Sequence, residues 1–445
     1  MQILFSPLGD TDPVRGCYDG GCLHILRHYR PEMVVLFYTA AMREKEDRDH
    51  RYTRGVAAVS PDCAVREIVS DAQNVHLYDE FMTLLPKHIR ALHEEFPEAT
   101  ILLNLSSATP QIKAVLAILA AEEDWCVGVQ VASPARASNR HNPAASDEED
   151  VAALLENNFD NEPGTENRCS EPPLKVIHYY EEKSRLLSLI QRYDYSGALT
   201  LAQKSDLISQ DVKRLLRHAA HRLRLETNKA REVLREYQGY TLFPFHEDEK
   251  QEALVEYFLT MQLTVKRDDL PSLLLKAIPF LYTFLAAYLR KESKLSLDLL
   301  GKPRRKALYL ERDRIEKAAP ELLGFLDKKN SGQFRDGELS YWLGDQICQY
   351  LGEHDLVQDV ERHEKVLRIL DKVRGCNQLR NQTAHEIVNI DKETFRAAVG
   401  LLPQEFIKAC SDLLCLYYGG KVRKLQNLYD DLNGWIRDSL ERAAV

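Results

Sequence analysis

The sequence ILLNLSSATPQ, residues 101–111, joins an apolar run to a polar loop and a helix start. Ile101–Leu103 have the continuous apolar character of a strand buried on both faces. After the two serines of the loop, Thr109 is the expected N-cap of a helix that carries Pro110 at its first position. Hydroxyl groups and free backbone N–H groups at a helix start form a site for phosphate or another anion.

The same alternation of strands and helices extends from Met1 to about Ser133. Strands separated by helices indicate βαβ units with right-handed crossovers and a parallel sheet covered on both faces. The pattern therefore predicts an α/β Rossmann-like N-terminal domain. The predicted strands are Ile3–Phe5, Val34–Thr39, Ile101–Leu105 and Val127–Val131, with a weaker one near Glu67–Val69, and the predicted helices include Cys22–Tyr29, Asp79–Phe96 and Gln111–Glu123.

A second polar loop, SPLGDTDP at residues 6–13, follows the first strand. In doubly wound sheets ligands bind beyond the carboxyl ends of the strands, so both loops are candidate binding loops. Asp10 and Asp12 would repel a bare phosphate and are better suited to ribose hydroxyls or base edges. Ser, Thr, Asp and Pro are also ordinary turn and cap residues, and that simpler explanation stays open for each loop. Neither loop is a G-x-G-x-x-G or a Walker A motif, so a dinucleotide coenzyme and NTP hydrolysis gain no support.

The composition changes between Arg136 and Pro173. This segment contains nine acidic and three basic residues, a net charge of −6 in a chain whose formal charge is −9. We interpret residues 137–172 as a flexible acidic loop. The apolar segment Leu174–Tyr180 that follows is a candidate last strand, which places the first domain at residues 1–180.

Residues 181–445 show helical spacing and no convincing strand, so this second region is predicted to be all-α. Its longest apolar stretch, Leu273–Leu289, contains Lys276 and Pro279 and is short for a bilayer span. We interpret it as a buried helix. The other predicted helices are Leu186–Ile190, Val212–Leu225, Glu252–Leu263, Leu339–Tyr350, Val366–Val373 and Phe406–Tyr418.

The composition of the whole chain narrows the class of protein. Its 445 residues suffice for two or three domains, and a mean hydropathy of −0.38 is typical of a soluble globular protein. With 59 basic against 68 acidic residues, the composition excludes a nucleic-acid-binding protein whose whole surface is rich in Lys and Arg. It does not exclude a local basic patch. Nine cysteines without a C-x-x-C pair favour reduced thiols in the cytoplasm and argue against structural zinc, and we expect no metal site and no signal peptide.

Residues 379–386, LRNQTAHE, contain an Arg and a His five positions apart. Arg380 offers a fixed charge to a phosphate, and His385 can move protons near neutral pH. Asn381 precedes His385 by four residues, so both lie on one helix face. Similar pairs occur elsewhere in the chain, and a solvated helix face remains the simpler explanation of any bare match. Because residues five apart on a helix diverge by about 140°, a catalytic site would need two copies of this helix facing each other in a dimer.

Together these features resemble the type III CRISPR-associated accessory ribonucleases that consist of a CARF and a HEPN domain, the Csm-six type. The resemblance rests on SPLGDTDP and NLSSATPQ in a Rossmann-like domain, followed by R-N-x-x-A-H in a helical domain. It includes DTDPVRGCYDGGCLHILRH at residues 10–28 and the Tyr193–Tyr195 segment, and so covers essentially the whole chain.

The resemblance implies that CARF domains of a homodimer bind a cyclic oligoadenylate, and we favour cyclic hexa-adenylate over the tetra-adenylate. It also implies metal-independent cleavage of single-stranded RNA that leaves a 2′,3′-cyclic phosphate, without any cofactor. Arg380 would position the phosphate, Asn381 would orient it, His385 would transfer protons, and Thr109 is implicated in slow self-cleavage of the activator. No membrane association and no stable DNA binding are expected. The implied activator-binding residues are Gly9, Asp10, Thr11, Asp12, Asn104, Ser106, Ser107, Ala108, Thr109 and Gln111.

One residue departs from the family pattern, which usually has glycine where Ala108 stands. If this position needs a positive φ, alanine strains the loop and affects activator affinity, ring size and self-cleavage more than the fold. Two alternatives stay open for the function. One is a nucleotide-sensing regulator with a non-catalytic helical output domain, and the other is a toxin-like HEPN nuclease that senses a different nucleotide.

Overall fold

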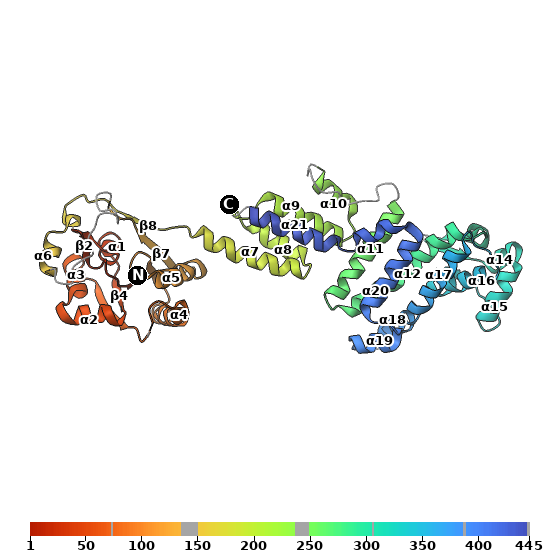
Figure 1. The fold of residues 1–445 in the computed structure, drawn as a ribbon, viewed down its shortest axis with the longest axis horizontal. Helices are drawn as coiled ribbons and strands as arrows, with labels where there is room; N and C mark the ends of the chain where they lie inside the picture. The colour runs from red at the N-terminus through yellow and green to blue at the C-terminus, as the bar shows by residue number, and fades with distance from the viewer. Residues whose placement is uncertain (73, 135–149, 236–248, 305–306, 386–388, 443–445) are drawn as a thin grey trace. The chain divides into compact units, whose positions relative to one another are not determined.

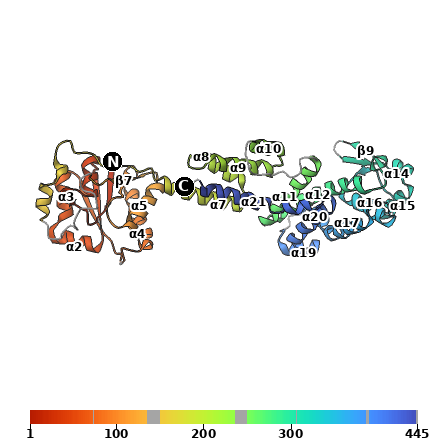
Figure 2. The ribbon, with the colours of Figure 1, turned by 45° about the horizontal axis from the view of Figure 1, so that its top comes forward.

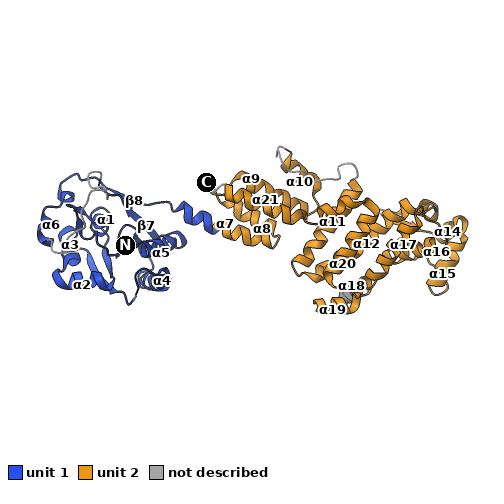
Figure 3. Cartoon of the chain, viewed as in Figure 1, with its two compact units in different colours: residues 1–181 blue, residues 182–445 orange. Residues whose placement is uncertain are grey.

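The computed structural model describes residues 1–72, 74–134, 150–235, 249–304, 307–385 and 389–442, with the side chains of 307 and 383–385 also outside the description. The chain divides into two compact units, Met1–Glu181 and Glu182–Val445 (Figure 3).

The first unit is built on a six-stranded sheet with the order β5-β4-β1-β6-β7-β8. The first five strands are parallel, and β8 pairs antiparallel with β7. The chain adds β4 and β5 on one side of β1 and then β6 and β7 on the other, so the direction of winding reverses at β1. The strands are β1 (Gln2–Pro7), β4 (Met33–Tyr38), β5 (Ala64–Val69), β6 (Thr100–Asn104), β7 (Cys126–Val131) and β8 (Cys169–Ser170), and a separate hairpin pairs β2 (Val14–Arg15) with β3 (Tyr18–Asp19).

Helices cover both faces of this sheet (Figures 1 and 2). Alternate residues of β1 point to opposite faces: Ile3 and Phe5 pack with α4 and α5, and Leu4 packs with α1 and α3. The central strands are therefore buried on both sides, which explains their continuous apolar sequences. The helices are α1 (Gly21–Tyr29), α2 (Ala40–Asp49), α3 (Arg51–Val59), α4 (Tyr78–Glu95), α5 (Pro110–Glu122) and α6 (Val151–Glu156).

The acidic segment differs from the flexible loop that its composition predicted. Residues 137–149 lie outside the described residues, but from Asp150 onward the chain forms α6, the 3₁₀ turn η1 (Phe159–Asn161) and strand β8. The prediction of a loop up to residue 172 is therefore wrong for this part. Hydrogen bonds from the Arg168 N–H to His24 and from Asn158 to Asp19 hold these residues against α1 and β3, and composition alone does not reveal partners of that kind.

The predicted last strand, Leu174–Tyr180, is also wrong, because these residues enter helix α7 (Lys175–Gln191). A short apolar run cannot by itself distinguish a buried strand from part of a helix. Here the apolar spacing continues through Leu186 and Ile190, both of which are buried, and that longer period favours the helix.

The second unit is largely helical, as predicted, and α7 continues into it. The last helix, α21, returns to pack on α9, and Tyr195 donates a hydrogen bond to Asn433 Oδ1 at 2.7 Å. Its helices are α8 (Tyr195–Lys204), α9 (Gln210–Leu223), α10 (Thr227–Leu234), α11 (Glu249–Lys266), α12 (Leu270–Glu292), α13 (Leu297–Leu300), α14 (Arg312–Ala318), α15 (Pro320–Lys329), α16 (Tyr341–Glu353), α17 (Val360–Val373), α18 (Gly375–His385), α19 (Lys392–Val399), α20 (Pro403–Tyr418), η2 (Gly420–Leu425) and α21 (Leu428–Arg442).

Two features of this unit bear on the sequence predictions. The apolar stretch Leu273–Leu289 is helical and lies in α12, which packs on α11, α16 and α18. Among the described residues, α12 is the one helix long and apolar enough to cross a bilayer, and half of its most apolar window is buried in the protein. The prediction of no strand is wrong: β9 (Gly301–Arg304), β10 (Ala307–Leu310) and β11 (Gly337–Glu338) form a small antiparallel sheet. These strands are too short to show a period of two.

Candidate functional site

The two candidate loops of the first unit meet at one edge of the sheet. They follow β1 and β6, which are neighbouring parallel strands with Phe5 opposite Leu103. Their contact is so close that a Cβ atom placed on Gly9 would lie 2.6 Å from the backbone nitrogen of Ala108. Because the winding reverses at β1, this is the position at which doubly wound sheets bind ligands.

Asn104 and Ser107 hold the second loop rather than face solvent. Both are buried, and Asn104 Nδ2 donates to Ser6 Oγ at 2.9 Å and to Ser107 Oγ at 3.1 Å. Asn104 Oδ1 accepts the backbone N–H of Ser106 at 2.9 Å. Ser106 Oγ accepts the backbone N–H of Val131 at 2.6 Å, which ties the loop to β7. These predicted ligand residues therefore shape the loop.

Asp12 plays a similar part in the first loop. Its carboxylate accepts the backbone N–H groups of Gly9 and Cys22, each at 3.1 Å, and only 5% of the residue is exposed. Burial raises the pKa of Asp12 to about 6, although both backbone hydrogen bonds act in the opposite direction. Asp12 thus fixes the loop to the start of α1 and is poorly placed to bind a ligand directly.

The remaining predicted residues leave polar groups nearer the surface. Asp10 is exposed and forms an ion pair with Lys45 at 3.0 Å, while Thr11 is half-buried. Thr109 is the N-cap of α5, as predicted, and its hydroxyl accepts the backbone N–H of Ile112 at 3.5 Å. Gln111 has a buried side-chain oxygen without a hydrogen-bond partner among the described residues. Such an acceptor requires a donor, and a bound ligand can supply one.

Ala108 has φ = 73°, in the left-handed region that favours glycine. Alanine was expected to strain the loop if this position needs a positive φ, and the backbone has a positive φ there. The left-handed residue directly precedes the N-cap of α5 and turns the chain from the β6 loop into the helix. This geometry places the strain within the candidate ligand site.

Lys45 and Gly21 also belong to the surroundings of these loops and were not among the residues expected from the sequence. A Cβ atom on Gly21 would lie 2.6 Å from Ser107 Oγ, so glycine is needed where α1 begins against the second loop. The Gly20-Gly21 pair before an apolar helix was a usable signal for this close approach. Lys45 lies in a helix of mixed charge, AAMREKEDRD, where nothing in the sequence distinguishes it.

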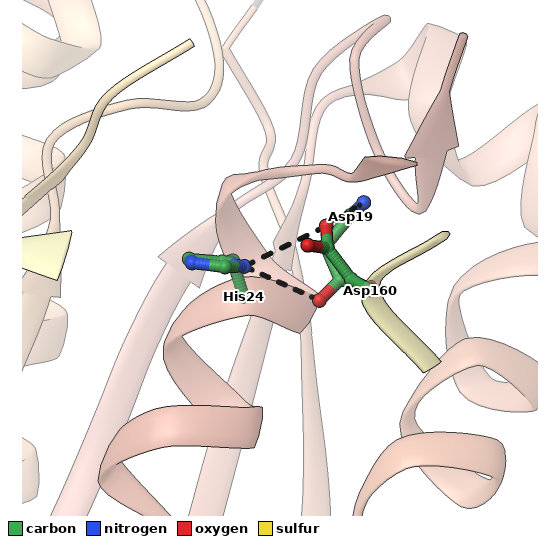
Figure 4. Close-up of side chains that lie close together, drawn as sticks. All are labelled: Asp19, His24 and Asp160. Atoms are coloured by element: carbon green, nitrogen blue, oxygen red, sulfur yellow. Dashed lines mark hydrogen bonds and ion pairs between the residues drawn. The ribbon is translucent and has the colours of Figure 1, made fainter. Parts of the chain in front are cut away.

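Asp19, His24 and Asp160 form a buried cluster whose oxygen and nitrogen atoms resemble a metal-ligand set (Figure 4). His24 Nδ1 lies 3.3 Å from Asp19 Oδ2 and 3.8 Å from Asp160 Oδ2. Two guanidinium groups already contact these carboxylates, from Arg27 on Asp19 at 2.8 Å and from Arg168 on Asp160 at 2.5 Å. A cation would have to displace them, so the cluster fits an ion-pair network better than a metal site.

This network fixes residues 158–168 of the acidic segment to α1. His24 Nε2 accepts the backbone N–H of Arg168 at 3.0 Å, and Asp19 also accepts a hydrogen bond from Asn158 at 2.7 Å. Burial would raise the pKa of Asp19, but the hydrogen bonds from His24 and Arg27 outweigh it and lower that pKa to about 2. Asp19 therefore remains ionised at neutral pH.

The Arg/His motif lies on α18 in the second unit. Arg380 and Asn381 are both exposed, and Arg380 Nη1 donates to Asn381 Oδ1 at 3.3 Å. His385 is the last residue of the helix, and its side chain lies outside the described residues. One helix therefore carries all three predicted catalytic residues, at the spacing that motivated the composite dimer site.

Buried contacts hold the start of α18. Cys376 and Leu379 are buried, and Gly375 lies so close to the backbone of Ala398 on α19 that a Cβ atom would clash. Arg374, immediately before the helix, is bound to the buried carboxylate of Asp345 on α16 at 3.1 Å. These contacts fix the helix that presents Arg380 and Asn381.

Comparison with known proteins identifies the family. The family models described as Cas_Csm6 CARF domain, CRISPR-associated protein Csm6 6H domain and Cas_Csm6 HEPN domain match residues 64–169, 174–223 and 242–437. A protein of Mycobacterium tuberculosis, the CRISPR system endoribonuclease Csm6, is 33% identical over 448 residues, with all of both chains covered. The chain belongs to the Csm6 family.

Other Csm6 proteins match at lower identity. The Csm6 endoribonuclease of Enterococcus italicus is 24% identical, with 88% of this chain and 90% of that protein covered, and one from Streptococcus thermophilus is 24% identical, with 99% and 100% covered. A solved structure of Enterococcus italicus Csm6 bound to cyclic hexa-2′-fluoro-hexa-dAMP covers 99% of this chain and 100% of that chain, with a TM-score of 0.65. At 20% identity, this similarity shows the fold. The CARF–HEPN architecture inferred from the sequence is confirmed.

Proposed function

We propose that this chain is a homodimeric endoribonuclease of a type III CRISPR system, which a cyclic oligoadenylate activates through the CARF unit. The main support is the pairing of two features in one chain of the Csm6 family. The candidate loops meet at the winding reversal of the sheet, and α18 carries Arg380 and Asn381 at the surface. The relatives are endoribonucleases by name, and the solved Enterococcus italicus protein holds a cyclic hexanucleotide analogue.

The proposed reaction is an internal transfer at the RNA phosphate. The ribose 2′-oxygen attacks the adjacent phosphorus and loses its proton to a base, and the bond from phosphorus to the 5′-oxygen breaks. The leaving 5′-oxygen takes a proton, and the products are a 2′,3′-cyclic phosphate and a 5′-hydroxyl. His385 carries the protons, and Arg380 stabilises the charge that develops on the phosphate while Asn381 orients it. No step requires a metal ion.

An RNase assay tests this proposal. Wild-type protein, His385→Ala and Arg380→Ala are incubated with a labelled single strand, with and without cyclic tri-, tetra- or hexa-adenylate. We expect cleavage by the wild type with cyclic hexa-adenylate, including in EDTA, and a loss of at least about 100-fold in the His385 variant. The matched control is His354→Ala, which removes an exposed histidine at the C-terminal end of α16. We expect this variant to retain activity. Equal cleavage by wild type and His385→Ala would rule out the proposal.

The dimer and its composite site are tested by mixing. His385→Ala protein is added to wild-type protein and the two are allowed to exchange subunits. If each site needs groups from both chains, the mixed dimers are inactive, so the RNase activity per wild-type chain falls below that of wild-type protein diluted with buffer. Sedimentation under the assay conditions gives the oligomeric state independently. We propose a cytoplasmic location, which suits nine cysteines that are all unpaired.

Slow self-cleavage of the activator is a separate proposal for the CARF unit. Cyclic hexa-adenylate is incubated with His385→Ala protein, which removes the RNase site, and with the same protein carrying Thr109→Asn or Thr109→Ser. Because the Thr109 hydroxyl also caps α5, asparagine keeps a cap acceptor but removes the hydroxyl, whereas serine keeps both. Turnover lost in the asparagine variant and kept in the serine variant supports a direct role of the hydroxyl.

A further inference from the structure

A basic groove of about 600 Å³ lies in the second unit, apart from the Arg/His motif. It is formed by α17, α20 and η2, and four of its lining residues are cationic: Lys365, Arg368, Lys372 and Arg423. Asp412 is the single acidic residue among those that line it. The groove therefore has a formal charge of +3 in a chain whose total is −9.

The cations have a regular arrangement on α17. Lys365, Arg368 and Lys372 are spaced by three and four residues, so they form one stripe about 10 Å long at 1.5 Å per residue. The opposite side of the helix carries Val366 and Leu370, which are fully buried. The stripe thus faces outward because the apolar residues fix the rotation of the helix.

These cations are available to a ligand. Lys365 pairs with Glu361 at 2.6 Å and Arg368 with Glu364 at 3.6 Å, but both carboxylates are exposed, and such surface pairs exchange readily. Within the described part of the chain, neither Lys372 nor Arg423 forms an ion pair. A polyanion that enters the groove therefore has to displace only these two exposed carboxylates.

We propose that this groove binds the ribose-phosphate backbone of the single-stranded RNA substrate. The inference rests on the proposed ribonuclease function and adds a binding site to it. Arg374 has helical dihedral angles and is the one residue between α17 and α18, so the groove and the Arg380 motif lie on consecutive helices. At about 3.4 Å per nucleotide of a stacked strand, a stripe of this length meets about three phosphates.

The lining also predicts how the groove reads RNA. No aromatic residue is among those that line it, so bases have no ring on which to stack. Contacts to phosphates position a strand without reading its sequence. The groove should therefore raise affinity for any single strand by a similar factor.

The test compares two triple variants with the same change in charge. Arg368→Gln, Lys372→Gln and Arg423→Gln remove groove cations, whereas Lys317→Gln, Lys328→Gln and Arg437→Gln remove exposed cations elsewhere in the unit. In a His385→Ala background, binding of a fluorescent 2′-O-methyl RNA, which cannot be cleaved, is measured between 50 and 200 mM salt. We expect the groove variant to bind about tenfold or more weakly at low salt, with a salt slope reduced by about 2 for three lost contacts at about 0.7 each.

Steady-state kinetics provide a second readout in the active background. The groove variant should raise KM for a long RNA and leave kcat within about twofold, because the groove contacts substrate and transition state alike. If the two triple variants bind RNA with equal affinity and equal salt slope, the proposal is wrong. The groove would then be a candidate site for an acidic protein partner. If the wild type cleaves no RNA but the groove variant still loses RNA binding, the proposed enzymatic function fails and the binding groove stands.

Discussion

Gly9 and Ala108 contact each other across the two candidate loops of the CARF unit, at the carboxyl ends of β1 and β6. The backbone nitrogen of Ala108 occupies the space that any side chain on Gly9 would need. Each loop therefore sets the position of the other, and a change on either side alters the shape of the ligand site.

We expect Gly9→Ala to separate the loops. The added methyl group meets backbone atoms that cannot rotate away, so we expect a loss of about 1–3 kcal/mol in the free energy of unfolding and at least tenfold weaker binding of cyclic hexa-adenylate. Denaturant unfolding and calorimetric titration measure the two effects. Gly324→Ala, where a Cβ atom meets nothing within 4 Å, is the control and should be neutral or slightly stabilising. Unchanged activator affinity in Gly9→Ala would contradict the assignment of this loop to the site.

We expect Ala108→Gly to stabilise the first unit. A left-handed alanine costs roughly 1–2 kcal/mol, and the greater entropy of unfolded glycine offsets part of the gain, so the net effect is about 0.5–1 kcal/mol. The neighbouring Ala114→Gly in α5 should have the opposite sign, because glycine destabilises a helix interior by about 1 kcal/mol. Thermal unfolding of both variants decides the matter, and destabilisation by both would show that Ala108 is not strained.

We expect Asp345→Asn to impair the nuclease through the position of α18. Asp345 is fully buried and forms an ion pair with Arg374. Without this carboxylate the partly buried guanidinium group of Arg374 loses its buried partner, so the free energy of unfolding falls by about 2 kcal/mol. We expect kcat for activated RNA cleavage to fall about tenfold or more, with KM changed less. Asp371→Asn removes an exposed carboxylate from the same Arg374 and should cost under about 0.5 kcal/mol. Equal activity of the two variants would argue against this positioning role.

The raised pKa of Asp12 predicts a pH dependence of stability. Because the pKa is about 6 in the folded protein and 3.8 in the unfolded chain, the favourable contribution is complete below pH 3.8 and is lost as the pH rises through 6. Relative to Asp12→Asn, wild type should therefore lose about 2 kcal/mol of unfolding free energy between pH 4 and 7. Urea unfolding of both proteins at several pH values measures this difference, and a difference independent of pH would contradict the burial of an ionisable Asp12.

Local sequence determined the sheet and several details of the site. The apolar runs of β1, β4 and β6 are buried on both faces, and no other environment suits them in a chain of this composition. Thr109 and Pro110 predicted the start of α5 because an N-cap hydroxyl and a proline act within a single turn. The strain at Ala108 was expected only from the family pattern, which usually has glycine there, because alanine by itself favours a negative φ.

Only the tertiary structure decided which polar residues support the loops and which remain for a ligand. Asn104 and Asp12 are as polar as Asp10, yet the first two are buried among Ser6, Ser107 and Cys22, while Asp10 reaches the surface. Ser6 and Cys22 come from other segments of the chain, and no short-range pattern encodes those contacts. The same reason explains the structure of residues 158–168: the hydrogen bonds from the Arg168 N–H to His24 and from Asn158 to Asp19 join this segment to residues more than 130 positions away in the chain.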